Sequence, residues 1–117
     1  MAWQDRSIRI GFVGAGFMGQ AAHLRNYVHV PGCQVVALAE VRPDLAERVA
    51  RRYGIPRTYP DHHAMLDAEQ LDGVVASQPY ARHQALLPEL FTRVRHVFTE
   101  KPIAIGVETG RQLVAAA

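Results

Sequence analysis

The chain has 117 residues, 49% hydrophobic and 21% charged, which suits the core of one globular domain but hardly of two. It has no apolar run of 18 residues and no basic stretch leading into an apolar one at its start, so we expect neither a membrane span nor a secretory signal. The net charge of +2, with many arginines four residues from a carboxylate, argues against nucleic acid as a partner. The single cysteine, Cys33, excludes an internal disulfide and fits a reducing, cytoplasmic setting.

The first half of the chain alternates β-rich runs with helical patterns. We expect a strand at Ile8–Val13 and then a helix at Phe17–Val28, where apolar residues recur every three or four positions until a Pro-Gly pair ends the pattern. A nearly all-apolar second strand follows at Cys33–Glu40, as suits a strand that is covered on both faces. The second helix, Pro43–Gly54, begins with proline and ends with glycine, and both residues favour those positions.

The second half continues this alternation with shorter elements. The expected elements are strand Arg57–Tyr59, helix Asp61–Leu66, strand Leu71–Ser77, helix Ala81–Val94, strand His96–Glu100 and helix Val107–Ala117. We expect a kink or a restart at Pro88, because proline removes a backbone hydrogen bond. The alternation predicts one α/β domain over residues 1–117, with a doubly wound parallel sheet in the strand order 3-2-1-4-5. Since the last helical pattern simply stops, we also expect a longer protein with a further domain.

A glycine-rich turn joins the first expected strand to the first expected helix. Gly14, Gly16 and Gly19 fit the pattern G-x-G-x-x-G: the first would allow the tight turn, the second would let a pyrophosphate approach the backbone, and the third would let the helix pack closely. Phe17 and Met18 complete the motif, at a helix start whose free N–H groups and positive dipole end attract phosphate. The pattern in this setting predicts a dinucleotide-binding site.

An acidic residue stands where that site would need one. Glu40 follows Gly19 by 21 residues and ends the second expected strand, where an acid accepts hydrogen bonds from the adenosine ribose hydroxyls. A carboxylate there favours a free 2′-hydroxyl, and therefore NAD over NADP. Arg42 could instead pair with a 2′-phosphate, which keeps NADP open as the alternative, or it could simply be a solvated residue at the start of the second helix.

Polar residues also follow the fourth and fifth expected strands. Ser77, Gln78 and Pro79 come after the fourth, and Glu100 and Lys101 come at the end of the fifth. Ligands of a doubly wound sheet bind beyond the carboxyl ends of its strands, so we expect these residues near the nicotinamide. Lys101 is the only lysine of the chain, and it is a compact donor that Glu100 could hold or orient, or it could be a solvated loop residue.

The histidines give weaker indications. His83 would stand near the start of a helix, where it could position Tyr80 or the cofactor ribose, cap the helix, or merely pack. Four more histidines make no credible metal set with acid or cysteine partners, so surface or packing roles are expected for them. These four are His23, His29, His62 and His63.

Together these motifs resemble the glucose–fructose oxidoreductase/inositol dehydrogenase (Gfo/Idh/MocA) family, from about Ile8 to about Gly110. The resemblance rests on the glycine turn, Glu40, Pro79 followed by His83, and above all Glu100-Lys101-Pro102. It implies a Rossmann domain followed by a C-terminal α+β domain that binds substrate and often forms an oligomer interface. It also implies hydride transfer between a nicotinamide and a hydroxyl or carbonyl group of a sugar, polyol or related small molecule, with Lys101 as the catalytic lysine.

Two other functions remain open from the sequence. The domain could be a non-catalytic dinucleotide sensor or scaffold, in which Lys101 would play no chemical part. It could also bind another Rossmann ligand, such as S-adenosylmethionine, whose ribose would suit Glu40 but would leave the Glu-Lys-Pro segment without a role. If the chain is part of an oxidoreductase, as the family resemblance implies, the isolated 117 residues are expected to bind dinucleotide weakly and to be nearly inactive.

Overall fold

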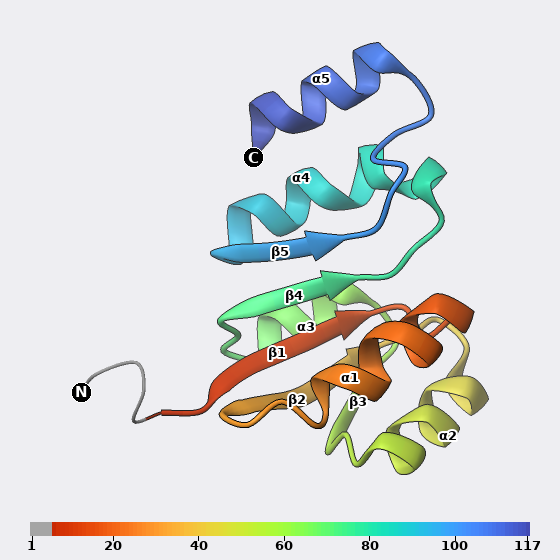
Figure 1. Ribbon diagram of the computed structural model, residues 1–117, viewed down its shortest axis with the longest axis vertical. Helices are drawn as coiled ribbons and strands as arrows, with labels where there is room; N and C mark the ends of the chain where they lie inside the picture. Colours follow the sequence, from red (N-terminus) through yellow and green to blue (C-terminus); the bar gives the residue numbers. More distant parts are fainter. Residues whose placement is uncertain (1–5) are drawn as a thin grey trace.

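The computed structural model describes residues 6–117, which form a parallel five-stranded sheet between layers of helices (Figure 1). Its strand order, β3-β2-β1-β4-β5, confirms the predicted doubly wound topology. The order reverses between β1 and β4, so the carboxyl ends of these two strands flank the switch point. The strands are β1 Ile8–Val13, β2 Cys33–Ala39, β3 Arg57–Tyr59, β4 Gly73–Ala76 and β5 His96–Thr99.

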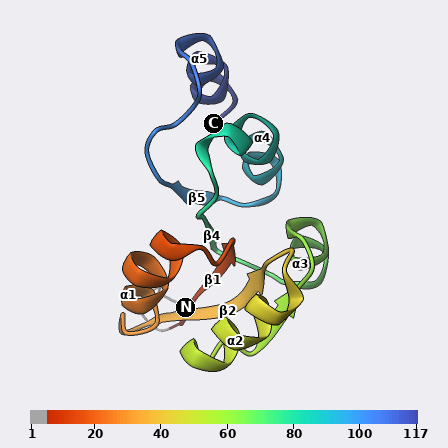
Figure 2. The same cartoon turned by 90° about the vertical axis from the view of Figure 1, so that its right-hand side faces the viewer.

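Helices cover both faces of the sheet. Figure 2 shows α1 and α2 on one side and α3 and α4 on the other, with α5 beside α4. Among residues 6–117, no helix is long and apolar enough to cross a membrane. The helical elements are the π-helical segment η2 Gly19–Leu24, α1 Arg25–Tyr27, α2 Pro43–Tyr53, α3 His62–Ala68, the 3₁₀ turn η3 Tyr80–Arg82, α4 His83–Arg93 and α5 Val107–Ala116.

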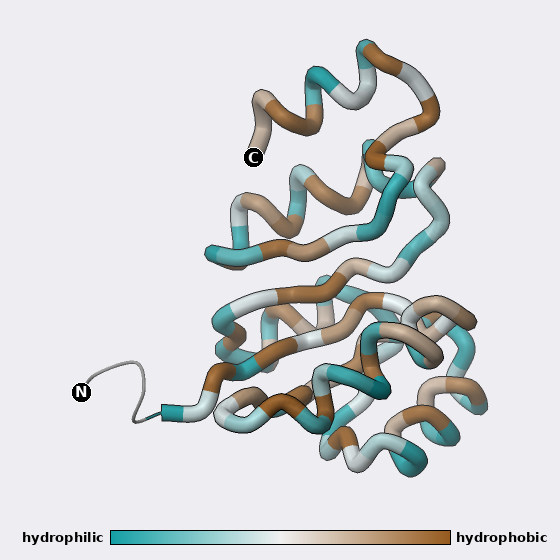
Figure 3. The backbone as a smooth tube through the Cα atoms, viewed as in Figure 1, coloured by the Kyte–Doolittle hydropathy of each residue, from teal (hydrophilic) through white to brown (hydrophobic). Residues whose placement is uncertain are grey.

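Each face of the sheet has its own apolar core. Phe12 and Val13 are neighbours on β1, and because successive strand side chains point to opposite faces, they belong to different cores. Phe12 is fully buried beneath α1 and α2, whereas Val13 packs on the side of α3 and α4. Figure 3 shows hydrophobic residues running along the central strands. Burial on both faces explains why β2 is almost entirely apolar.

Several predicted boundaries are off by one or two residues. The first helix starts at Phe17, as predicted. It continues as the π-helical segment η2 and ends at Tyr27, the last residue of α1. Glu40, Ser77 and Glu100 follow their strands instead of ending them. The backbone of these three residues therefore leaves the sheet at its carboxyl edge, where a ligand of a doubly wound sheet binds.

Of the kink or restart predicted at Pro88, the restart does not occur, because α4 runs through this residue as one helix. Leu87 and Leu90 stand on either side of Pro88 and are both fully buried in the core. Their packing holds the helix together across the missing backbone hydrogen bond, so tertiary contacts override the local preference.

Candidate functional site

A cavity of about 520 Å³ opens at the carboxyl edge of the sheet, beside the switch point. This volume lies within the usual range of small-molecule sites. The cavity contains most of the residues that the sequence assigned to cofactor binding. Its walls include the glycine turn 14–16, residues 39–42 after β2, residues 77–79 after β4, and the side chains Asp61, His62, Arg82 and Glu89.

Gly14 makes the tight turn that the motif predicts. Its φ of 96° lies in the left-handed region, which residues with a side chain rarely adopt. A Cβ atom on Gly14 would also lie 2.3 Å from the carbonyl oxygen of Ser77. Conformation and close approach thus both require glycine at this position.

The other two glycines of the motif have different surroundings. A Cβ atom on Gly19 would lie 2.9 Å from Oγ of Ser77, so Gly19 lets the first helix approach the end of β4. A Cβ atom on Gly16 would meet nothing within 4 Å, which leaves open space over the turn for a ligand. Phe17 and Met18 begin the helix and are exposed, at 81% and 51%, outside the cavity lining.

Glu40 is buried directly after β2 and lines the cavity. Its Oε1 accepts hydrogen bonds from the Ala15 amide at 3.2 Å and from Nη2 of Arg42 at 2.8 Å, and its Oε2 accepts from the Arg42 amide and Nε at 2.9 and 3.1 Å. Burial disfavours the charged form, but the bonds from Arg42 and Ala15 outweigh it and lower the pKa of Glu40. The carboxylate is therefore ionised at neutral pH, and a ribose hydroxyl would share or replace its present donors.

Ser77, Gln78 and Pro79 line the cavity opposite Glu40, as the topology predicts. His83 does not line it, because its ring is 1% exposed and packs beneath the loop that follows β5. Nδ1 of His83 lies 2.8 Å from the carbonyl oxygen of Ile103, and Nε2 lies 3.1 Å from Oγ1 of Thr99. His83 therefore anchors the loop that carries Lys101.

Lys101 lies two residues after the end of β5, on an exposed loop outside the cavity lining. Within residues 6–117 its ammonium group forms no ion pair. Glu100, which was expected to orient this amine, instead places Oε1 2.7 Å from Nε2 of His23, and its Oε2 accepts a hydrogen bond from the Lys101 amide. The Glu100 carboxylate thus fixes the backbone of the loop and forms no ion pair with the Lys101 ammonium group.

One wall of the cavity was not predicted from the sequence. Asp61 and His62 at the start of α3, Arg82 in η3 and Glu89 on α4 all line it. The only local signal was the position of Asp61 and His62 after the third strand, and therefore at the same sheet edge as the other strand tips. Arg82 and Glu89 belong to the helical stretch after the fourth strand, and only the packing of that stretch against α3 turns them toward the cavity.

A tight glycine turn, an open cavity at the switch point and a buried acid after β2 together define a dinucleotide-binding domain of the Rossmann type. The chain belongs to the Gfo/Idh/MocA family, since the family described as "Oxidoreductase family, NAD-binding Rossmann fold" matches residues 8–117. The predicted family is therefore confirmed, and the chain is a Rossmann NAD-binding domain of that oxidoreductase family.

Named relatives and solved structures agree with this assignment. The chain is 35% identical to an inositol 2-dehydrogenase from Acidothermus cellulolyticus, over 86% of this chain and 29% of the relative. It is 31% identical to an inositol 2-dehydrogenase from Rubrobacter xylanophilus, over 99% of this chain and 33% of the relative. It also resembles the crystal structure of a 3-ketoreductase from Actinomadura kijaniata with NADP and TDP-benzene, with a TM-score of 0.87, 26% identity and coverage of 96% and 34%.

A myo-inositol dehydrogenase from Lactobacillus casei, solved with NAD(H) and myo-inositol, has a TM-score of 0.85 and 27% identity, with coverage of 94% of this chain and 33% of that one. The chain thus spans about a third of the length of the relatives it matches. The structural neighbours carry either NAD(H) or NADP, so a nicotinamide dinucleotide is supported as the cofactor and the choice between the two is left open.

Proposed function

We propose that this chain is the NAD-binding part of a dehydrogenase acting on a hydroxyl or carbonyl group of a sugar, polyol or related small molecule. The observation that carries the proposal is the cavity between the Gly14–Gly16 turn and Glu40, with free space directly over Gly16. In the same proposal, a C-terminal α+β domain binds the substrate and forms oligomer contacts, and the protein works in the cytoplasm. The named relatives that act on inositol support this substrate class.

The residues of the site suit the parts of a dinucleotide. The pyrophosphate would lie over Gly16, at the helix start formed by Phe17 and Met18, where backbone N–H groups and the helix dipole favour negative charge. The adenosine ribose would lie beside Glu40, since its carboxylate accepts hydroxyl hydrogen bonds. The nicotinamide would then extend past Ser77–Pro79 toward the loop of Lys101.

When bound, the nicotinamide supplies the group that accepts or gives the hydride. Lys101 would donate a hydrogen bond to the substrate oxygen and stabilise the negative charge that develops there. Its ammonium group is unpaired within residues 6–117, and it is a compact donor, unlike the forked guanidinium of arginine. Glu100 and His83 would hold the loop from its two ends.

We propose NAD as the preferred cofactor. Glu40 is ionised and buried at the ribose position, where it would repel a 2′-phosphate. Arg42 is the feature that favours NADP, but its guanidinium is already paired with both oxygens of Glu40. A 2′-phosphate would have to compete with that carboxylate for the arginine.

Calorimetric titration of the chain with NADH and with NADPH tests this proposal. We expect NADH to bind more tightly than NADPH. We expect Glu40→Gln to narrow or reverse this difference in affinity, because it removes the charge that repels the 2′-phosphate. Tighter binding of NADPH by the unaltered chain would contradict the choice of NAD. Absence of binding of either cofactor at millimolar concentration, by a chain that circular dichroism shows to be folded, would contradict the proposed site itself.

A further inference from the structure

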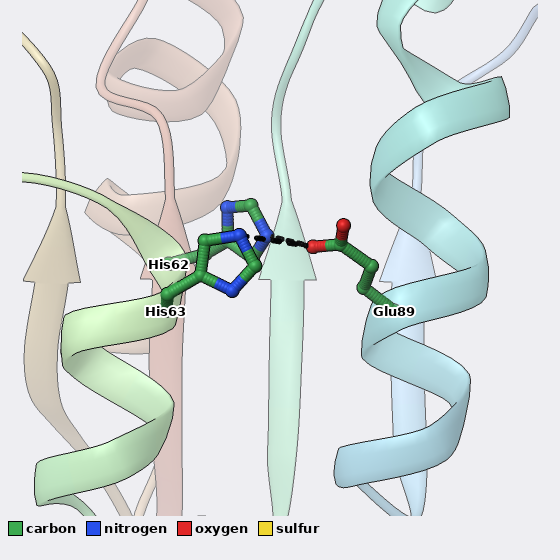
Figure 4. Close-up of side chains that lie close together, drawn as sticks. All are labelled: His62, His63 and Glu89. Carbon is green, nitrogen blue, oxygen red and sulfur yellow. Dashed lines mark hydrogen bonds and ion pairs between the residues drawn. The ribbon is translucent and has the colours of Figure 1, made fainter.

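Two histidines and a glutamate meet at the wall of the cavity. Nε2 of His62 lies 2.5 Å from Oε2 of Glu89, and Nε2 of His63 lies 3.3 Å from the same oxygen. One ligand atom from each residue lies within 4.8 Å of the other two. Figure 4 shows both imidazoles, on the first turn of α3, directed toward the carboxylate on α4. The cluster thus joins two adjacent histidines to a glutamate that follows them by 26 and 27 positions.

We propose that His62, His63 and Glu89 bind a divalent transition-metal ion of the zinc type. Imidazole nitrogen and carboxylate oxygen are common ligands of Zn²⁺, at about 2.0–2.2 Å in tetrahedral geometry. Ligand atoms at the corners of such a tetrahedron lie about 3.3 Å apart, as follows from those bond lengths. The His63–Glu89 distance already has this value, and the His62–Glu89 contact would lengthen by less than an ångström.

The cluster has the accessibility that a metal site needs. The side chains of His63 and Glu89 are 60% and 46% exposed, and that of His62 is 20% exposed, so an ion can reach them and water can fill the fourth position. Asp61 accepts a hydrogen bond from the Ala64 amide and fixes the first turn of α3.

The proposed metal site lies in the wall of the cavity. His62 and Glu89 line the same space as Gly14 and Glu40, so a bound ion would stand in the wall of the proposed dinucleotide site. The ion would also link α3 to α4, the two helices that carry the side chains drawn in Figure 4. This link requires neither the glycine turn nor Lys101, so the metal site is independent of the proposed oxidoreductase function.

Zinc titration of the metal-free chain tests the site directly. We expect one Zn²⁺ per chain by calorimetry, and with Co²⁺ we expect the strong visible absorption of a four-coordinate ion. His62→Ala, His63→Ala and Glu89→Gln should each weaken binding by at least about tenfold, since each removes one of three protein ligands. His29→Ala is the matched control, because it removes an exposed imidazole from another part of the chain.

Thermal melting gives a second measurement. Zn²⁺ that binds the folded chain should raise its Tm, and the rise should disappear in the three variants but persist in His29→Ala. A chain that binds no Zn²⁺, or ligand variants that bind it as well as the control does, would overturn the proposal. His63→Ala and Glu89→Gln alter largely exposed side chains, so they keep the test valid even where His62→Ala disturbs the fold.

Discussion

Nε2 of His23 lies 2.7 Å from Oε1 of Glu100, and this contact ties the first helix to the residue that precedes Lys101. The His23 ring also packs edge-on against Phe98 of β5, with 5.1 Å between the ring centroids. The helix that follows the glycine turn therefore holds the tip of β5, and the two ends of the proposed dinucleotide site are mechanically connected.

Removing this contact should destabilise the chain modestly. We expect His23→Ala to lower the free energy of unfolding by about 1 kcal/mol, because a partly buried hydrogen bond to a carboxylate and an aromatic contact are both lost. Urea unfolding measures the change. The control is His29→Ala, which removes an exposed imidazole and should change stability by less than about 0.5 kcal/mol. Equal losses in the two variants would show that the His23–Glu100 contact contributes nothing.

Two glycines of the same motif should respond to alanine in opposite ways. Gly14→Ala should destabilise the fold by about 3 kcal/mol or more, because its φ is 96° and its Cβ would overlap the backbone of Ser77. Gly16→Ala should leave stability within about 0.5 kcal/mol of the parent, since the added Cβ meets nothing.

The same Gly16→Ala change should nonetheless abolish NADH binding, because the methyl group occupies the space over the turn where the pyrophosphate would lie. Urea unfolding and calorimetric titration of the two variants separate the structural role from the binding role. Tight NADH binding by Gly16→Ala would place the phosphates elsewhere.

The sheet topology and the glycine turn could be predicted because their signals are local. β1 and β2 are apolar runs bounded by turn residues, and the motif from Gly14 to Gly19 has fixed spacing. Glu40 was found in the same way, from its distance to the motif. Right-handed connections then leave few ways to arrange five parallel strands.

The contacts that complete the site could not be predicted, because they join distant segments through side-chain geometry. His23 meets Glu100 across 77 positions, and His62 meets Glu89 across 27. Asp61 and Asp67 are the acids nearest to His62 and His63 in the sequence, and only the packing of α3 beside α4 brings Glu89 to the two imidazoles. The π-helical segment η2 in the first helix and the continuation of α4 through Pro88 likewise depend on tertiary packing.

Glu40 should make stability depend on pH in a defined direction. Its pKa in the folded chain is lowered, since bonds from Arg42 and Ala15 outweigh burial. Its contribution is therefore fully present above the ordinary carboxyl pKa, about 4.3, and is lost as the pH falls through the lower, folded value. Glu40→Gln should cost about 1–2 kcal/mol at pH 7, and progressively less below about pH 4.

Urea unfolding of the unaltered chain and of Glu40→Gln at about pH 7, 4 and 3 measures the cost above and below the ordinary carboxyl pKa. Other carboxylates with lowered pKa values, such as Glu69 and Asp72, titrate in both chains and cancel in the comparison. Glu47→Gln is the control, because the Glu47–Arg51 pair is largely exposed and should contribute little at any pH. A cost of Glu40→Gln that does not change with pH would exclude ionised Glu40 as its source.

Lys101 should affect chemistry far more than cofactor binding. In a protein that contains this chain together with its substrate-binding domain, we expect Lys101→Met to lower kcat by about 10²–10³-fold, the usual effect of removing a donor to a developing oxyanion. The Kd for NADH should change little, because Lys101 lies outside the cavity lining. Steady-state kinetics and calorimetry measure the two quantities.

Lys101→Arg is the matched variant, since it keeps the charge but replaces the compact donor with a planar fork, and it should restore only part of the activity. Loss of turnover and of NADH affinity in the same proportion would assign Lys101 to cofactor binding alone. That result would favour the alternative of a non-catalytic dinucleotide-binding module.

His83 should stabilise the loop that carries Lys101. The carbonyl oxygen of Ile103 can only accept, so Nδ1 of the buried ring carries the proton and donates to it. His83→Phe keeps the bulk but removes this donor and the partner of Thr99, so we expect a loss of about 1–3 kcal/mol in urea unfolding. The loop should also be cut faster by proteases. Gln84→Ala, at the exposed neighbouring position, is the control. If His83→Phe is as stable and as protease-resistant as Gln84→Ala, the histidine fills space and its hydrogen bonds do not hold the loop.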